Sequence, residues 1–187
     1  MAIRTITAST GGNYPSSWNE VTVTKASYGT YDGTKYIDIW FDGVPDNCNL
    51  RCYEKISEKS GEEFAIARIF KYANAGIQNV VSQDGKSDII TYDDEPQGLV
   101  GKKMWVYFYK GKSGYTTPLD QPAPVAQQGE HISYSEEDVD SLKDHAFRYY
   151  SKYKKPKEGN GYDTVAESMD DVKEALGFKS DNSAPPF

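Results

Sequence analysis

The chain has 187 residues, of which 37% are hydrophobic, 13% aromatic and 26% charged, and its formal net charge is −7 at pH 7. Its mean hydropathy is −0.71, and no apolar run approaches the roughly 18–20 residues of a membrane-spanning helix. These values, and an opening MAIRTITASTGG without the hydrophobic segment of a secretory signal, argue against a membrane-spanning or secreted protein.

Residues 1–17 resemble a flexible lead-in, and a domain follows at 18–125. The alternation EVTVTKA predicts a first strand over 20–26, and Asp32-Gly33 predicts a turn into a second strand over 35–41. A third strand is predicted over 49–55. It contains Cys52, and the other cysteine, Cys48, lies four positions earlier. Along an extended strand the two would be ~13 Å apart, too far for a disulfide, which favours a reducing, cytoplasmic compartment.

A helix is expected next, because Ser60 and Glu63 have the spacing of a capping box and Gly76 is a natural stop. The stretches 83–86 and 93–98 are predicted to be polar loops. A fourth strand is predicted over 103–109, and Pro118 confines a short fifth strand over 115–119 to a sheet edge. Three strands, a helix and two strands is the order of an OB-fold, so we expect a mostly β, five-stranded OB-like barrel with one helix between strands 3 and 4.

Beyond the barrel, residues 126–134 are predicted to be a linker and 135–178 a helical, acidic extension. Ser135 caps the first of its two helices, and Thr164 caps the second. Residues 128–187 hold 8 basic and 13 acidic residues, whereas residues 1–127 hold 13 and 15, so most of the acidity lies outside the barrel. The last nine residues, 179–187, are too polar and proline-rich to fold alone.

The second, third and fourth strands divide their side chains in the same way. One face is aliphatic and the other mixes aromatic rings with charge, because side chains alternate along a strand. Flat rings beside cations suit unpaired bases and phosphates. We therefore expect a nucleic-acid-binding surface made of Tyr36, Trp40, Arg51, Tyr53, Lys55, Lys103, Trp105, Tyr107, Tyr109, Lys110 and Lys112. The alternative is that these rings are good strand formers packed against other protein elements.

Enzymatic signals are weak. Two Gly-Lys-Ser triplets, at 85–87 and 111–113, lack the glycine that a phosphate-binding P-loop needs five positions earlier. His131 and His145 are accompanied by no nucleophile, and the acids at 136–140 fit a helix N-terminus better than a calcium loop. We therefore expect that the protein is not an enzyme and that it binds no cofactor and no metal.

Two parts of the chain resemble bacterial and bacteriophage single-stranded-DNA-binding proteins of the OB-fold type. The opening WNEVTVTKA from Trp18, the segment GLVGKK from Gly98 and the closing PAP from Pro122 are similar to the barrel of that family over about half of the chain. The tip APPF, with Phe187 last, resembles its C-terminal tails, although only one acid, Asp181, lies within the last seven residues.

The resemblance implies sequence-tolerant binding of single-stranded DNA in replication or recombination, in the cytoplasm of a phage-infected bacterium. It also implies that Asp181, Pro185, Pro186 and Phe187 recruit replication or recombination proteins. A homo-oligomer fits the same pattern. The rival hypothesis is a phage structural or assembly protein that uses the aromatic sheet face as a subunit interface, since Tyr and Trp are enriched at protein interfaces too.

Overall fold

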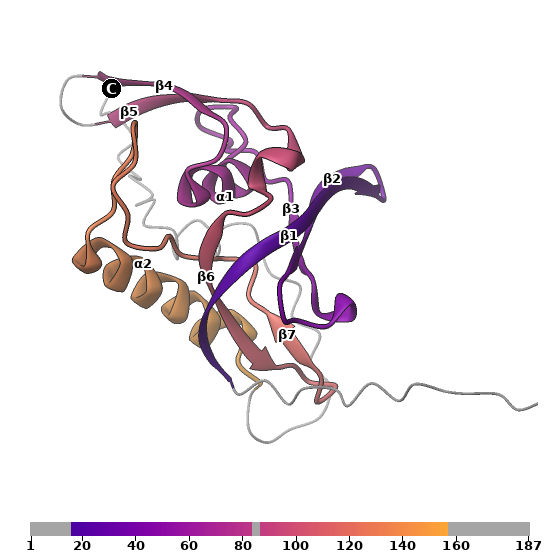
Figure 1. Ribbon diagram of the computed structural model, residues 1–187. Coiled ribbons are helices and arrows are strands. Elements are labelled where there is room, and N and C mark those ends of the chain that lie inside the picture. Colours follow the sequence, from indigo (N-terminus) through magenta and orange to yellow (C-terminus); the bar gives the residue numbers. More distant parts are fainter. Residues whose placement is uncertain (1–15, 84–86, 157–187) are drawn as a thin grey trace, which may run out of the picture.

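The structure is a computed structural model that describes residues 16–83 and 87–156 (Figure 1). The expectations for the lead-in, for the second helix of the extension and for the tail with Asp181, Pro185, Pro186 and Phe187 lie outside the described residues.

The described chain forms a large sheet, a separate hairpin and two α-helices. The large sheet contains β1 (Ser17–Tyr31), β2 (Thr34–Phe41), β3 (Leu50–Tyr53), β6 (Lys103–Lys110) and β7 (Thr116–Pro118). The hairpin consists of β4 (Ile77–Gln83) and β5 (Ser87–Tyr92). The helices are α1 (Ala65–Ala73) and α2 (Glu136–Tyr149), and α2 continues into a π-helical turn, η3 (Tyr150–Lys154). Short 3₁₀ turns are η1 (Asp46–Cys48) and η2 (Pro96–Leu99).

The large sheet is antiparallel, with strand order β3-β2-β1-β6-β7. Its long strand β1 pairs with β6 through Ser17–Thr22 and with β2 from Val23 onward, so one strand belongs to both halves of the sheet. The prediction of a mostly β chain with five strands and a helix between the third and fourth is confirmed for this sheet. The β4–β5 hairpin was not predicted, because each of its strands has only one pair of adjacent apolar residues, Val80–Val81 in β4 and Ile89–Ile90 in β5.

The two edges of the sheet approach each other at one point. The Cys48 thiol, in the turn before β3, donates a hydrogen bond to the Thr116 carbonyl of β7 at 3.4 Å. In the described part of the chain no ladder of backbone hydrogen bonds joins β3 to β7. The observed architecture is therefore a curved five-stranded sheet whose edges meet through η1 and β7.

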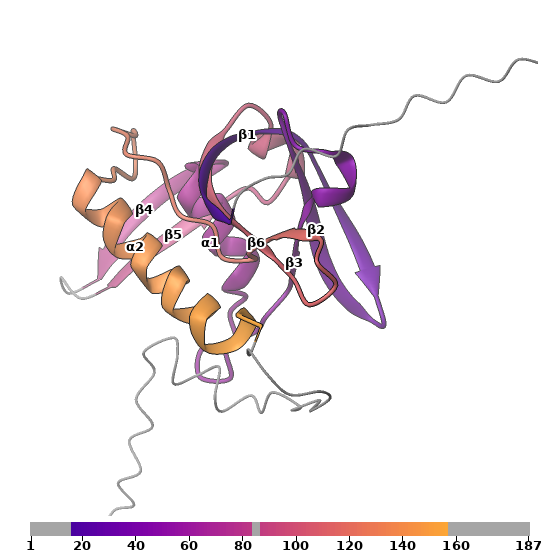
Figure 2. The same ribbon diagram turned by 90° about the horizontal axis from the view of Figure 1, so that it is seen from below.

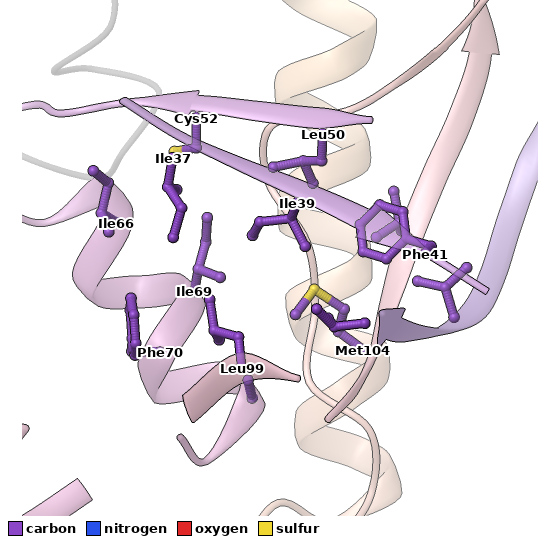
Figure 3. Packing of buried hydrophobic residues seen from close by; sticks show 14 of the residues in the cluster. Ile37, Ile39, Phe41, Leu50, Cys52, Ile66, Ile69, Phe70, Leu99 and Met104 are labelled. Atoms are coloured by element: carbon purple, nitrogen blue, oxygen red, sulfur yellow. The ribbon is translucent and has the colours of Figure 1, made fainter. Parts of the chain in front are cut away.

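The core lies between the concave face of this sheet and α1 (Figure 3). The inward residues of the strands are the aliphatic ones that the alternation predicted: Ile37, Ile39 and Leu50 are fully buried, as are Met104 and Val106. The helix contributes Ile66, Ile69 and Phe70, and Leu99 packs beside them. Burial of such side chains stabilises a fold by about 1.5–3 kcal/mol each.

The helix α1 begins later than the sequence suggested. Ser60 was predicted to cap it, but the first helical residue is Ala65. The Glu63 carboxylate instead accepts the backbone N–H groups of Ala65, Ile66 and Ala67 at 2.7–2.8 Å. A carboxylate satisfies these orphan donors and also complements the positive end of the helix dipole, so it replaces the predicted hydroxyl cap.

The helix α2 begins where its sequence predicted. Ser135 is the N-cap, and its hydroxyl accepts the Asp138 N–H while the Asp138 carboxylate accepts from the Ser135 N–H. The buried side of α2 holds Val139, Ala146 and Tyr149. In both ribbon views α2 lies alongside β6, away from the β1–β2 hairpin (Figures 1 and 2).

Candidate nucleic-acid interface

The side of the sheet opposite the core gathers four of the predicted binding residues at the β3 edge. Tyr36 and Trp40 project from β2, and Arg51 and Tyr53 project from β3, because they alternate with the buried aliphatic residues of those strands. Two further side chains complete this surface, which we call the β1–β3 outer face. It consists of Lys25, Tyr36, Asp38, Trp40, Arg51 and Tyr53.

Arg51 is the centre of one half of this face. Its Nε and Nη2 donate to the two Asp38 carboxylate oxygens at 2.8 and 2.7 Å, directly across the β2–β3 pair. Its guanidinium carbon lies 4.0 Å from the centroid of the Tyr36 ring, and that ring meets Tyr53 edge-on with centroids 5.5 Å apart. The hydrogen bonds that Arg51 donates to Asp38 raise the pKa of Arg51 further above its already high value. The guanidinium is therefore a fixed, permanently charged group.

Tyr36 owes its position to a glycine on the neighbouring strand. Gly29 is paired with Tyr36 across β1 and β2, and a side chain at Gly29 would collide with the Tyr36 ring. One side of the ring thus lies against the β1 backbone, and the Arg51 guanidinium lies over the ring.

Trp40 is the centre of the other half. Its indole N–H donates to the Asp46 carbonyl at 3.1 Å, and the Lys25 ammonium lies 4.5 Å from the ring centroid. The ring is half-buried, so part of its surface is open to solvent beside a cation. Such an arrangement suits a base that stacks on the indole while its phosphate approaches the ammonium.

The aromatic residues of β6 do not belong to this face. Tyr107 and Tyr109 were predicted to be exposed, but each is only 9% exposed because α2 and η3 pack over them. The Tyr150 ring lies 5.0 Å from Tyr107 and 4.9 Å from Tyr109, centroid to centroid. Burial raises the pKa of both β6 tyrosines. The expectation that these rings are exposed is therefore wrong for the described residues.

Trp105 and Lys103, also on β6, are engaged with other residues. The Lys143 ammonium of α2 lies 3.4 Å from the centroid of the Trp105 ring, and desolvation there lowers the pKa of Lys143. Lys103 forms an ion pair with Glu20 of β1 at 2.9 Å. Trp105 was predicted to face away from the core, and it does, but toward α2 rather than toward solvent.

The remaining predicted cations lie at the margins. Lys110 and Lys112 are exposed at the turn between β6 and β7, where Tyr115 is 76% exposed. Lys55 is half-buried just after β3, and its backbone is hydrogen-bonded to Glu63 and Phe64. The structure therefore divides the predicted set into a β2–β3 group, a group beneath α2 and isolated lysines.

Two residues of the β1–β3 outer face were not predicted as site residues. Strict alternation from Val21 and Val23 would turn Lys25 toward the core, but a bulge at Thr24 shifts the register and pairs Lys25 with Trp40 on the outside. The sequence placed Asp38 on the aromatic face of its strand, because it alternates with Tyr36 and Trp40, but no function was predicted for it. Its pairing with Arg51 could not be predicted, because it depends on the register of β2 with β3.

Other features of the described residues bear on enzymatic activity and metal binding. A cleft of about 430 Å³ lies between the β4–β5 hairpin and the start of α2, and Lys71, His131 and Tyr134 are among its lining residues. The Asp138 carboxylate in it is engaged in the α2 cap. Within residues 16–83 and 87–156 no cluster of three or more His, Cys, Asp or Glu residues could hold a metal ion. Both cysteines are buried and free, and burial raises the pKa of Cys52 to about 12.

Neither helix in the described ranges is long and apolar enough to cross a membrane. Comparisons with protein-family models, with curated proteins and with solved structures find no match to this chain.

Proposed function

We propose that the protein binds single-stranded DNA without sequence preference, on the β1–β3 outer face, during replication or recombination. The observation that carries the proposal is that one face of the sheet holds two aromatic groups in contact with cations. These are the Trp40 indole with Lys25, and the Tyr36–Tyr53 pair with Arg51. The Arg51 side chain is 42% exposed, and α2 covers β6 instead of this face. Stacking on such groups contributes about 1–3 kcal/mol per base and tolerates any sequence.

The topology supports the same conclusion. We propose that the curved sheet is an OB-like barrel, with β6 and β7 as its fourth and fifth strands and α1 between the third and fourth. The long β1 that pairs with both β2 and β6, and the Cys48–Thr116 contact between the sheet edges, fit a barrel that is closed through η1 and β7. OB-folds bind oligonucleotides on the face of strands 2 and 3, where this chain carries its exposed rings.

The local charge is compatible with a polyanion although the whole chain is acidic. Lys25 and Arg51 outnumber Asp38 on the β1–β3 outer face, and Lys110 and Lys112 lie on the exposed β6–β7 turn. At 0.1 M salt charges are screened over about 10 Å, so the distant acids repel a bound strand only weakly. The resemblance of the C-terminal tip to phage single-strand-binding proteins extends the proposal to the recruitment of partner proteins through Phe187.

The direct test is binding to labelled oligo-dT, followed by fluorescence anisotropy over a series of salt concentrations. We expect the logarithm of the affinity to fall linearly with the logarithm of salt, by about 0.7 per phosphate contact. A duplex of the same length should bind much more weakly, because stacking on the rings needs unpaired bases. Equal affinity for the single strand and the duplex at matched salt contradicts the proposal.

A subunit interface is the second candidate, and the packing of β6 favours it. The rings of Tyr107 and Tyr109 are buried by another aromatic-rich element of the same chain, so the outward aromatic residues of this sheet do form protein contacts. Sedimentation velocity separates the two functions. If the β1–β3 outer face joins subunits, Trp40→Ala dissociates an oligomer, and wild-type protein does not bind oligo-dT at low salt.

A further inference from the structure

The Arg51 guanidinium interacts with three side chains of the β1–β3 outer face. Asp38 accepts from it twice, Tyr36 lies beneath it at 4.0 Å, and a side-chain hydrogen bond to Tyr53 contributes to its raised pKa. A bidentate carboxylate pair fixes the plane of a guanidinium as well as its position. Arg51 therefore presents a planar group in one orientation.

This arrangement decides which surface a base can reach. The Tyr36 ring has the β1 backbone at Gly29 beside it and the guanidinium over it, so little of the ring is left to stack on. The Arg51 side chain is 42% exposed, whereas that of Asp38 is 11% exposed. The accessible plane in this half of the face is the guanidinium.

The charge balance also argues against a phosphate as the main ligand of Arg51. The Asp38 carboxylate, 2.7 Å from Nη2, offsets much of the positive charge, and a phosphate at Arg51 would lie close to that carboxylate. A base carries no net charge, so the Asp38 carboxylate does not repel it. Arginine planes are known stacking partners of unpaired bases, and the underlying tyrosine adds a cation–π contact that holds the plane flat.

We propose that the Arg51 guanidinium, held by Asp38 and supported by Tyr36, is a stacking platform for one unpaired base of the bound strand, and that Asp38 is its positioning residue. This inference rests on the proposed function and assigns Arg51 to base contact instead of phosphate contact. Trp40 is the second platform. Tyr36, which lies beneath the guanidinium, and Trp40 are four positions apart on β2, roughly 13 Å along the strand.

The experiment compares two ligands of equal length and charge. One is oligo-dT, and the other is a single-stranded oligonucleotide made of abasic residues, which keeps the phosphates and lacks the bases. Arg51→Lys keeps the positive charge and loses the plane. We expect it to weaken oligo-dT binding about fivefold or more and to leave abasic binding unchanged. Because both ligands are measured on the same preparation, any unfolded fraction lowers both affinities equally and does not change their ratio.

Asp38→Asn provides a test whose sign differs between the two roles. The substitution removes a negative charge from the binding face, so a phosphate role for Arg51 predicts tighter binding to both ligands. The stacking role predicts weaker binding to oligo-dT, since the second acceptor that orients the guanidinium is lost. Thermal unfolding of the variant, followed by circular dichroism, establishes the temperature at which both titrations are made on folded protein.

The matched control is Arg148→Lys, on the exposed side of α2, which should change neither affinity. The inference is overturned if Arg51→Lys binds oligo-dT as wild type does, if it loses abasic binding in the same proportion, or if Asp38→Asn tightens both. These results differ from a failure of the proposed function, in which wild-type protein itself does not bind oligo-dT.

Discussion

Trp40 differs from the other two tryptophans of the chain in the part of the sheet on which it lies. Trp18 meets the Tyr107 ring edge-on in the cluster beneath α2, and Trp105 lies under the Lys143 ammonium. Trp40 is half-buried on the β1–β3 outer face, with the Lys25 ammonium over its ring. Only Trp40 is therefore placed to report on a strand bound to that face.

We expect oligo-dT to quench the tryptophan fluorescence of the wild-type protein, because a base stacked on Trp40 offers an efficient quenching contact. Trp40→Phe should abolish most of the quench. It should weaken binding by less than the ~1–3 kcal/mol that stacking of one base contributes, since phenylalanine keeps a smaller stacking ring. Trp18→Phe and Trp105→Phe are the matched controls and should keep the quench. Loss of the quench in Trp105→Phe alone would place the strand on β6 instead.

At the scale of elements, the helix α2 determines which part of the aromatic surface is available. Strand alternation correctly predicted that Ile37, Leu50 and Met104 face the core. It could not predict that α2 covers β6, because docking of a helix on a sheet depends on contacts far apart in the sequence. The bulge at Thr24 is a second limit of pattern reasoning, since one extra residue exchanges the faces of a strand.

The capping box of α2 gives a test of how firmly the helix holds β6. Ser135→Ala removes the hydroxyl that accepts the Asp138 N–H, and loss of such a cap costs about 1 kcal/mol. We expect the midpoint of urea denaturation to fall, and hydrogen exchange to rise along α2 before it rises in β2. Ser141→Ala, exposed on the same helix, is the control and should change neither measurement.

The same cap predicts a pH dependence. Hydrogen bonds from the Ser135 hydroxyl and N–H lower the pKa of Asp138 below its value of 3.8 in an unfolded chain. A lowered folded-state pKa contributes stability that is present above the unfolded value and is lost as the pH falls through the folded value. Stability should therefore differ between wild type and Asp138→Asn at neutral pH, and the two should converge under acid. A constant difference down to the lowest pH at which both fold would contradict this assignment.

For the whole molecule, most of the net negative charge lies in the C-terminal part of the sequence. Residues 157–187 hold three basic and seven acidic side chains, a net charge of −4 within the chain's −7. A polyanion that approaches the β1–β3 outer face meets a nearly neutral domain, together with a covalently attached acidic segment at a high effective concentration. Screening by salt weakens any competition between that segment and DNA.

Removal of residues 178–187 is the prediction that tests this division of roles. The deleted segment contains Asp181 and Lys179, so its removal changes the net charge little, and it includes the Phe187 ring. We expect oligo-dT affinity and its salt dependence to stay as in the wild type, since no residue of the β1–β3 outer face is touched. Capture of replication or recombination proteins should be lost, because the proposed recruitment of partner proteins depends on Phe187. Phe187→Ala should reproduce the loss of capture, and Lys179→Ala serves as the control. Weaker oligo-dT binding by the truncated protein would show that the tip belongs to the DNA site, and the separation of binding face from recruiting tail would then be wrong.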